Sequence, residues 1–310
     1  MRRTADEFGG GRGDASLSIL LELWTILGAY REAMVLIGGW APYFILRRYR
    51  EPDNPFEHVG SIDIDVALSP AAIGAREYAT IAELITKRGY RPRLNRLGKP
   101  IEFAFEREVA VPGDAGGAIV EVDFLAPEYG GTGKGRRHQV VQDDLLARKA
   151  RGADVVFDHN FPFRVAGLLP NGAEASVEIR VADVVGCLTT KGIAIGQRYA
   201  EKDAYDIYAV VANYKKGPRD AAAEVAQFLD NSLVHEAMSN IADKFQTIRA
   251  PGPQWVADFL ATSAHERDRV AADAYVQVTT FLERAGFKTG DETQGSSSAG
   301  REDEHGRRRS

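Results

Sequence analysis

The chain is poor in cysteine and has no long apolar run. Cys187 is the single cysteine among 310 residues, which excludes an intramolecular disulfide and a zinc site built from several cysteines. The most apolar stretch, LSILLELWTILGAY, carries Glu22 and is too short to span a bilayer. The polar, glycine-rich N-terminus lacks the apolar core of a signal peptide. We therefore expect a cytoplasmic protein with no membrane partner.

The sequence also lacks a strong excess of charge of one sign. Its formal net charge is −5, so bulk electrostatics do not indicate a nucleic-acid binder, although a local basic patch remains open. Hydrophobic residues make up 44% and charged residues 27%, as in an ordinary globular protein with a sizeable core. The chain contains no internal repeat.

The hydrophobic pattern divides the chain into four parts. We expect a disordered N-terminus at residues 1–14, a core of strands and helices at 15–178, a mainly helical domain at 179–287 and a disordered tail at 288–310. The predicted helices of the core are residues 16–32, 40–49 and 70–90, and the predicted strands are 34–37, 61–68, 100–109 and 118–126. Two shorter strand-like pieces lie near 154–158 and 161–169, and the helical part carries helices at 181–200, 202–214, 219–230, 232–245 and 266–285. This order predicts an α+β (mixed α/β) fold around a small mixed sheet.

The stretch GSIDIDVAL places two carboxylates, Asp63 and Asp65, in an apolar strand. Side chains alternate along a strand, so both would point to one face, where their like charges repel. A hard divalent cation such as Mg²⁺ would remove the conflict. An Asp-x-Asp pair alone is more often structural, but Asp123 follows in the similar stretch AIVEVDFLA. If the two strands are neighbours, three aspartates could hold two metal ions, which suits in-line nucleotidyl transfer.

A second set of charges lies in the helical part. Lys191 and Arg198 are seven residues apart and share one helical face, and Asp203 and Asp206 follow. The two aspartates could pair with the cations and aim them at a triphosphate. Asp203 could instead be only a helix cap, and the whole group a solvated cluster of salt bridges.

Other features are given smaller roles. GGTGKG lacks the spacing of a P-loop, and we expect instead a flexible loop over residues 130–138 that contacts phosphates of a nucleotide or an RNA acceptor. His58 is interpreted as a loop histidine rather than a catalyst. Gly38 and Gly39 are expected to let the backbone approach the sheet or a ligand closely.

Gly-Ser followed by D-I-D-V, with a later V-E-V-D-F-L, resembles the nucleotidyltransferase superfamily of the DNA polymerase β type. Together with LIGGWAPYFI and TTKGIAIGQRYAEKDAYDIYAV, these motifs resemble the AbiEii/AbiGii-type toxin nucleotidyltransferases of bacterial abortive-infection and toxin–antitoxin systems. The resemblance spans roughly residues 30–215. One departure is that relatives often carry Thr-Ser before the acidic pair, where this chain has Ser61 and Ile62.

The resemblance implies a polymerase β-like core that transfers NMP from an NTP to an acceptor, with the tRNA 3′ end as the leading candidate and a cognate antitoxin as a partner. It also implies two Mg²⁺ ions, with Mn²⁺ as an alternative. The implied roles are metal binding and catalysis for Asp63, Asp65 and Asp123, and nucleotide binding for Gly60, Ser61, Lys191, Arg198, Asp203 and Asp206.

Two other functions stay open at this stage. GGWA and H-x-x-x-x-D-x-D also resemble nucleotidyltransferases that modify antibiotics, so the acceptor could be a small molecule. The chain could also be a catalytically inactive NTP-binding regulatory module, although the presence of all three aspartates argues against it.

Overall fold

The structure is a computed structural model that describes residues 4–8, 11–73, 79–111, 114–128, 137–199, 201–261 and 263–287. The expected C-terminal tail, 288–310, and residues 130–136 of the expected flexible loop, 130–138, lie outside the described residues.

Nine strands of the described chain form one mixed sheet. Across the sheet the order is β3, β4, β5, β2, β1, β9, β8, with β7 beside the C-terminal part of β5 and β6 beside β7. The pairs β2–β5, β5–β7 and β1–β9 are parallel and the others antiparallel. The strands are β1 (Met34–Ile37), β2 (Ile64–Leu68), β3 (Arg91–Leu94), β4 (Pro100–Val111), β5 (Asp114–Pro127), β6 (His138–Gln142), β7 (Leu145–Ala150), β8 (Asn160–Leu168) and β9 (Glu174–Ala182).

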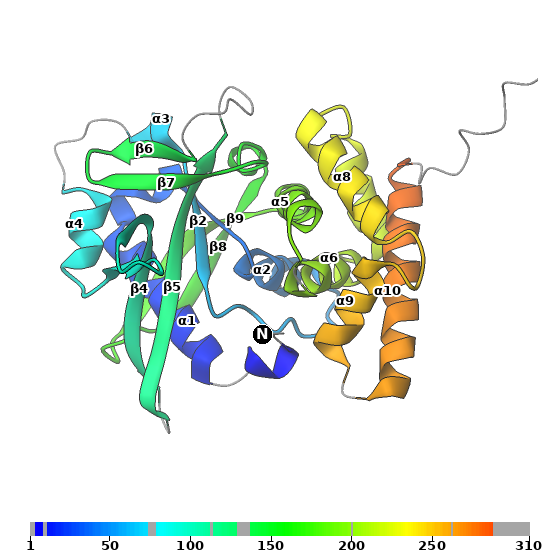
Figure 1. Ribbon diagram of the computed structural model, residues 1–310, viewed down its shortest axis with the longest axis horizontal. Coiled ribbons are helices and arrows are strands. Elements are labelled where there is room, and N and C mark those ends of the chain that lie inside the picture. The colour runs from blue at the N-terminus through cyan, green and yellow to red at the C-terminus, as the bar shows by residue number, and fades with distance from the viewer. Residues whose placement is uncertain are drawn as a thin grey trace, which may run out of the picture.

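The helices form two groups around this sheet. In Figure 1, α1 lies against one face of the sheet, and α2 lies between the sheet and the helices α5 and α6. Helices α8, α9 and α10 complete the helical side of the molecule. The helices are α1 (Gly11–Ile26), α2 (Trp40–Tyr49), α3 (Pro70–Ile73), α4 (Ile81–Thr86), α5 (Val184–Gln197), α6 (Glu201–Asn213), α7 (Pro218–Ala226), α8 (Ser232–Lys244), α9 (Pro251–Leu260) and α10 (Ala264–Arg284).

One contiguous apolar core runs through both groups. Buried residues from α1, from the central strands and from helices α5 to α8 and α10 belong to the same cluster. Burial of apolar surface is the main driving force of folding, so sheet and helices stabilise each other.

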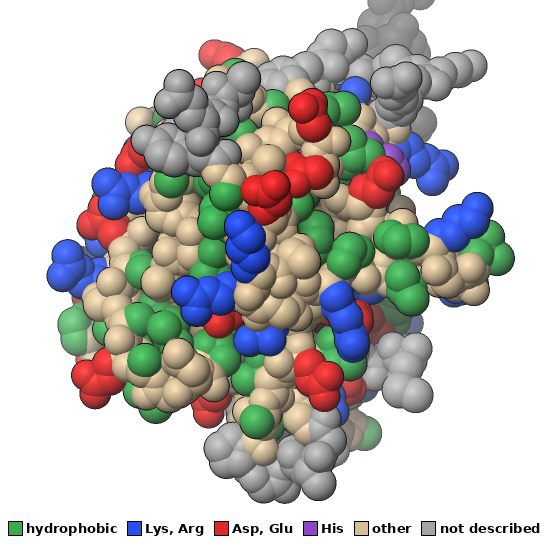
Figure 2. All heavy atoms as spheres, turned by 90° about the vertical axis from the view of Figure 1, so that its left-hand side faces the viewer, with side chains coloured by type: hydrophobic (Ala, Val, Ile, Leu, Met, Phe, Trp, Pro, Cys, Tyr) green, Lys and Arg blue, Asp and Glu red, His purple; other side chains and the backbone are tan. Residues whose placement is uncertain are grey.

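On the side of the molecule that carries α4, β6 and β7, the described residues bear charges of both signs. Figure 2 shows acidic and basic side chains interspersed with apolar ones on that side of the molecule. In the described parts of the chain, no helix combines the length and apolar character needed to cross a membrane.

The α+β class and the mixed sheet are confirmed, but the sheet is larger than predicted. Strands β3, β6, β7 and β9 and helix α9 were not foreseen, and residues 155–157, predicted as strand, form a 3₁₀ turn. The first helix begins at Gly11 rather than near residue 16, so part of the segment expected to be disordered is helical. Residues 178 and 179, where the sequence placed a domain boundary, both lie inside β9, which pairs with β1 and β8.

Candidate active site

A glycine pair brings the end of β1 against the acidic strand β2. The register pairs Ile37 with Asp65, and the chain then turns through Gly38 and Gly39 into α2. Gly38 has φ +68°, and a Cβ at that position would overlap the Asp65 carboxylate. A Cβ at Gly39 would lie 2.6 Å from Ser61 Oγ. The close backbone approach expected of these glycines is confirmed, and its target is the acidic strand.

Asp65 and Asp123 lie side by side because β2 and β5 are parallel neighbours. The register pairs Ile64 with Val122 and Asp65 with Asp123, so the two carboxylates leave the same face of the sheet. Burial, followed by the negative charge of Asp123, raises the pKa of Asp65 to about 6. Burial also raises the pKa of Asp123. The expected adjacency of the two acidic strands is therefore present, and it brings like charges together in a site poor in water.

Asp63 is placed less firmly than the sequence suggested. Strand β2 begins at Ile64, so strand alternation does not fix the direction of the Asp63 side chain. Its negative charge raises the pKa of both Asp65 and Asp123, which places it nearby. Among the described residues, no group of three or more His, Cys, Asp or Glu side chains is arranged to hold a metal ion. The structure thus presents a carboxylate pair with a third carboxylate near it, rather than an assembled triad.

The chemistry of the Asp65–Asp123 pair fits a divalent cation. Asp123 Oδ1 is buried without a hydrogen-bond partner, and burial disfavours ionisation of both carboxylates, an effect that the negative charge of Asp123 increases at Asp65. A hard cation accepts oxygen ligands of this kind and would offset the repulsion. Arg93, on β3, offsets part of it, since its Nη2 lies 3.5 Å from Asp123 Oδ1 while its Nη1 hydrogen-bonds Glu121.

A cavity of about 320 Å³ opens beside Asp65. Its volume is within the range of sites for small molecules. Five cations and two carboxylates contribute to its walls: Arg148, Lys149, Arg151, Lys191, Arg198, Asp65 and Asp203. The other predicted site residues, Gly60, Ser61, Asp63, Asp123 and Asp206, are not among the residues that line it. An excess of positive charge beside a carboxylate pair suits a polyanion that carries a metal ion.

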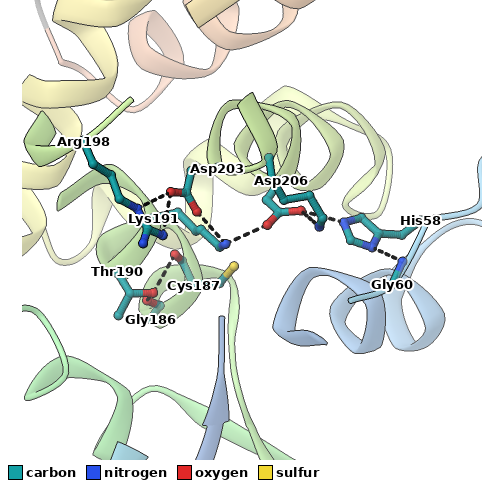
Figure 3. A network of polar contacts seen from close by, with 10 residues as sticks. His58, Gly60, Gly186, Cys187, Thr190, Lys191, Arg198, Asp203 and Asp206 are labelled. Atoms are coloured by element: carbon teal, nitrogen blue, oxygen red, sulfur yellow. Dashed lines mark hydrogen bonds and ion pairs between the residues drawn. The ribbon is translucent and has the colours of Figure 1, made fainter. Parts of the chain in front are cut away.

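The predicted pairing between the helical charges is present, and it is buried. Lys191 Nζ lies 2.8 Å from Asp203 Oδ1 and 2.7 Å from Asp206 Oδ2. Arg198 Nη2 lies 2.8 Å from Asp203 Oδ2, and Lys202 Nζ also contacts Asp206. Figure 3 shows Arg198, Asp203, Lys191 and Asp206 joined in one continuous network. Asp203 is therefore neither a simple cap nor part of a solvated cluster.

Ion pairing overcomes the cost of burial for Lys191, Asp203 and Asp206, whereas burial outweighs it for Lys202 and lowers the pKa of that ammonium. Burial disfavours the charged form of Lys191, but Asp203 and Asp206 outweigh it and raise the pKa of the ammonium. In the same way, Lys191 together with Arg198 or Lys202 lowers the pKa of each aspartate against the effect of burial. The network therefore keeps Lys191 cationic at the cavity wall. Asp183 positions this helix, because its side chain caps α5 by accepting from the N–H groups of Val185 and Gly186.

His58 was interpreted as a loop histidine, but it is buried and joins two parts of the site. Its Nδ1 accepts a hydrogen bond of 3.0 Å from the Gly60 N–H, so its Nε2 carries the proton and donates to Asp206 Oδ1 at 3.0 Å (Figure 3). Burial, aided by the charge of Lys202, lowers the pKa of His58 to about 4. The neutral histidine thus ties the Gly60–Ser61 turn to α6. The resemblance implied nucleotide binding for Gly60, but the Gly60 N–H is already used in the hydrogen bond to His58.

Arg148 is a cavity residue that the sequence analysis missed. It lies on β7, which the sequence did not predict, and its register partner on β5 is Leu125. Leu125 and Asp123 share a face of β5, so Arg148 lies on the aspartate side of the sheet. Its positive charge lowers the pKa of Asp65 and of Asp123, against the larger effect of burial. The short stretch LLARKA around it carries no pattern that would have identified Arg148 as a site residue.

Comparisons with models of protein families, with curated proteins and with solved structures give no match to this chain.

Proposed function

We propose that the protein is a metal-dependent nucleotidyltransferase of the abortive-infection and toxin–antitoxin toxin type. It would transfer NMP from an NTP to an acceptor hydroxyl. One observation carries the proposal: the parallel pairing of β2 and β5 sets Asp65 beside Asp123 at a cavity lined by five cations. Carboxylates that attract metal ions, next to cations that attract phosphates, are the two requirements of this chemistry.

The residues divide the work of the reaction between them. Asp65 and Asp123, with Asp63 near them, would hold Mg²⁺ or Mn²⁺, which when bound neutralises phosphate charge and orients the phosphate oxygens. Lys191, kept charged by Asp203 and Asp206, would hold the nucleotide phosphates at the cavity wall.

In the reaction, the acceptor oxygen forms a bond to the α-phosphorus, and the bond from that phosphorus to the bridging oxygen breaks. Pyrophosphate leaves with the electron pair of the broken bond. The acceptor proton passes to a carboxylate oxygen of the aspartate pair, with Asp123 in the role of base.

RNA is the preferred acceptor because basic residues lie next to the cavity. Arg137 precedes strand β6, and His138 on β6 pairs with the cavity residue Arg148 on β7. Such side chains can contact phosphates of a polynucleotide without reading its sequence. The 3′ end of tRNA is the specific acceptor that we propose.

The test is transfer of label from each of the four α-³²P-labelled NTPs to total tRNA in the presence of Mg²⁺. We expect labelled tRNA with the wild type and at least about a hundredfold less with Asp65→Asn or Asp123→Asn, because each variant removes a charged metal ligand. Asp230→Asn, an aspartate outside the site, is the matched control. Absence of transfer to any RNA by the wild type would refute the proposal for RNA.

Expression in a bacterial host separates the toxin from the antibiotic-modifying alternative. A toxin arrests growth in a manner that depends on Asp65 and is relieved by a cognate antitoxin. Resistance to an aminoglycoside or a lincosamide without growth arrest would point to a small-molecule acceptor instead.

A further inference from the structure

Arg148 differs from the other cations that line the cavity in having a buried nitrogen atom without a hydrogen-bond partner. Arg151 is held by Glu236, and Lys191 and Arg198 are held by the acidic residues of α6. Within the described part of the chain, Arg148 forms no ion pair, and its Nε atom is buried without a hydrogen-bond partner. Lys149 also forms no ion pair within the described part of the chain, but its ammonium nitrogen is not among the buried atoms that lack a hydrogen-bond partner. A buried guanidinium nitrogen without a partner is costly, so its presence at a cavity wall points to a ligand.

The position of Arg148 shows where that ligand would lie. Arg148 pairs with Leu125, two residues beyond Asp123 along β5, and both Arg148 and Asp65 line the cavity. Its charge acts on both aspartates, yet it makes no ion-pair contact with either. If Arg148 served only to neutralise them, its guanidinium would close onto a carboxylate. Instead Arg148 and Asp65 both line the cavity without forming an ion pair with each other.

The guanidinium is also oriented from outside the cavity. Its Cζ lies 5.9 Å from the centre of the Phe103 ring, a cation–π contact from strand β4. An arginine presents a planar fork of N–H donors that matches two phosphate oxygens, and a fork held in place loses less freedom when it binds.

From these observations we propose that Arg148 binds the β- and γ-phosphates of the nucleotide, the part that leaves as pyrophosphate. The inference rests on the proposed nucleotidyl transfer. The α-phosphate and the acceptor hydroxyl belong beside Asp65 and Asp123, and the β- and γ-phosphates extend across the cavity to Arg148. When the bond to the α-phosphorus breaks, negative charge grows on the bridging oxygen, and the guanidinium stabilises it by charge-assisted hydrogen bonds.

Calorimetric titration of the full chain tests this inference without turnover. The probes are sodium pyrophosphate, inorganic phosphate and AMP, each in the presence of Mg²⁺. We expect Arg148→Gln to weaken pyrophosphate binding by about tenfold or more, the size of a lost charge-assisted contact, and to leave AMP binding unchanged. Arg148→Lys keeps the charge without the fork and should fall between Arg148→Gln and the wild type. The matched control is Arg164→Gln on β8, which removes one positive charge elsewhere and should bind pyrophosphate as the wild type does.

Two results would overturn the inference: equal pyrophosphate affinity in the wild type and Arg148→Gln, or no pyrophosphate binding by the wild type. Melting temperatures of the variants establish that they are folded. If Arg148→Gln does not fold, the comparison is made with Arg148→Lys instead. Failure of this inference can be told apart from failure of the proposed function, because the label-transfer assay measures the function separately. Equal label transfer by the wild type and Arg148→Gln would support the proposed function but exclude this role for Arg148. Pyrophosphate binding that depends on Arg148, in a protein that transfers no nucleotide, would leave the subsite standing without the function.

Discussion

Removal of the Asp206 carboxylate is expected to destabilise the protein strongly. Asp206 is fully buried and contacts three groups: Lys191 at 2.7 Å, His58 at 3.0 Å and Lys202. In Asp206→Ala these groups remain buried, Lys202 loses its ion-pair partner, and Lys191 keeps only Asp203. Breaking one partner out of a buried ion pair costs about 3–5 kcal/mol, because a charge is left without compensation. We therefore expect the free energy of unfolding to fall by about 4 kcal/mol.

The measurement is urea unfolding at pH 7, followed by both circular dichroism and fluorescence to check that the transitions coincide. Glu224→Ala is the matched control, because Glu224 pairs with Lys215 at the same 2.7 Å but with side chains 34% and 41% exposed. Exposed pairs contribute about 0–1 kcal/mol. A loss in Asp206→Ala no larger than that in Glu224→Ala would refute the reasoning. The double variant Asp206→Ala/Lys202→Met should recover about 1 kcal/mol or more, because it removes one uncompensated charge.

Two further predictions concern pH and the glycine turn. The pKa of His58 falls from 6.5 in the unfolded chain to about 4 in the folded protein. Between pH 6.5 and 4 the unfolded chain therefore binds the His58 proton more readily than the folded protein does. As pH drops across this range, the free energy of unfolding should fall by up to about 3 kcal/mol. Asp65, whose pKa is raised to about 6, acts in the opposite sense, so the measurement is the difference in pH slope between the wild type and His58→Gln; equal slopes would contradict it. Gly38→Ala and Gly98→Ala both force alanine to φ near +70°, but only the first also meets the Asp65 carboxylate. Gly98→Ala should lose about 1–2 kcal/mol of stability, and Gly38→Ala should lose more and abolish nucleotide transfer as well; equal losses would exclude the contact with Asp65.

The elements that the sequence predicted well are those with a strong local signal. Strand β1 is a short apolar run ended by two glycines, and α2 follows with proline in its first turn. Strand β5 was recognised from its alternation of apolar and acidic residues. Strand β9, EASVEIRVA, also alternates between polar and apolar residues. Its first residues are largely exposed, and its last apolar residues run directly into the apolar pattern of helix α5, so the sequence did not separate the strand from the helix. Strand β3, RPRL, is short and largely exposed, so hardly any apolar signal marks it.

The site shows the same division between local and distant information. Sequence alternation identified Asp65 and Asp123 as candidates, but only the order of strands in the sheet makes them neighbours. His58 has no local signal, because its partner Asp206 is 148 residues away. Arg148 becomes a cavity residue only through the parallel pairing of β7 with β5. Such contacts depend on tertiary packing, which local propensity does not encode.

The buried network bears on the order in which contacts form during folding. It joins Gly60 and His58, before β2, to Lys191 and Asp206, which lie on helices after the last strand. Closing so long a loop costs chain entropy before the ion pairs form, so these contacts are expected to form late in folding. A chain that ends before α6 would lack the carboxylates that keep Lys191 charged and hold His58. The complete site therefore requires both the sheet and the two helices.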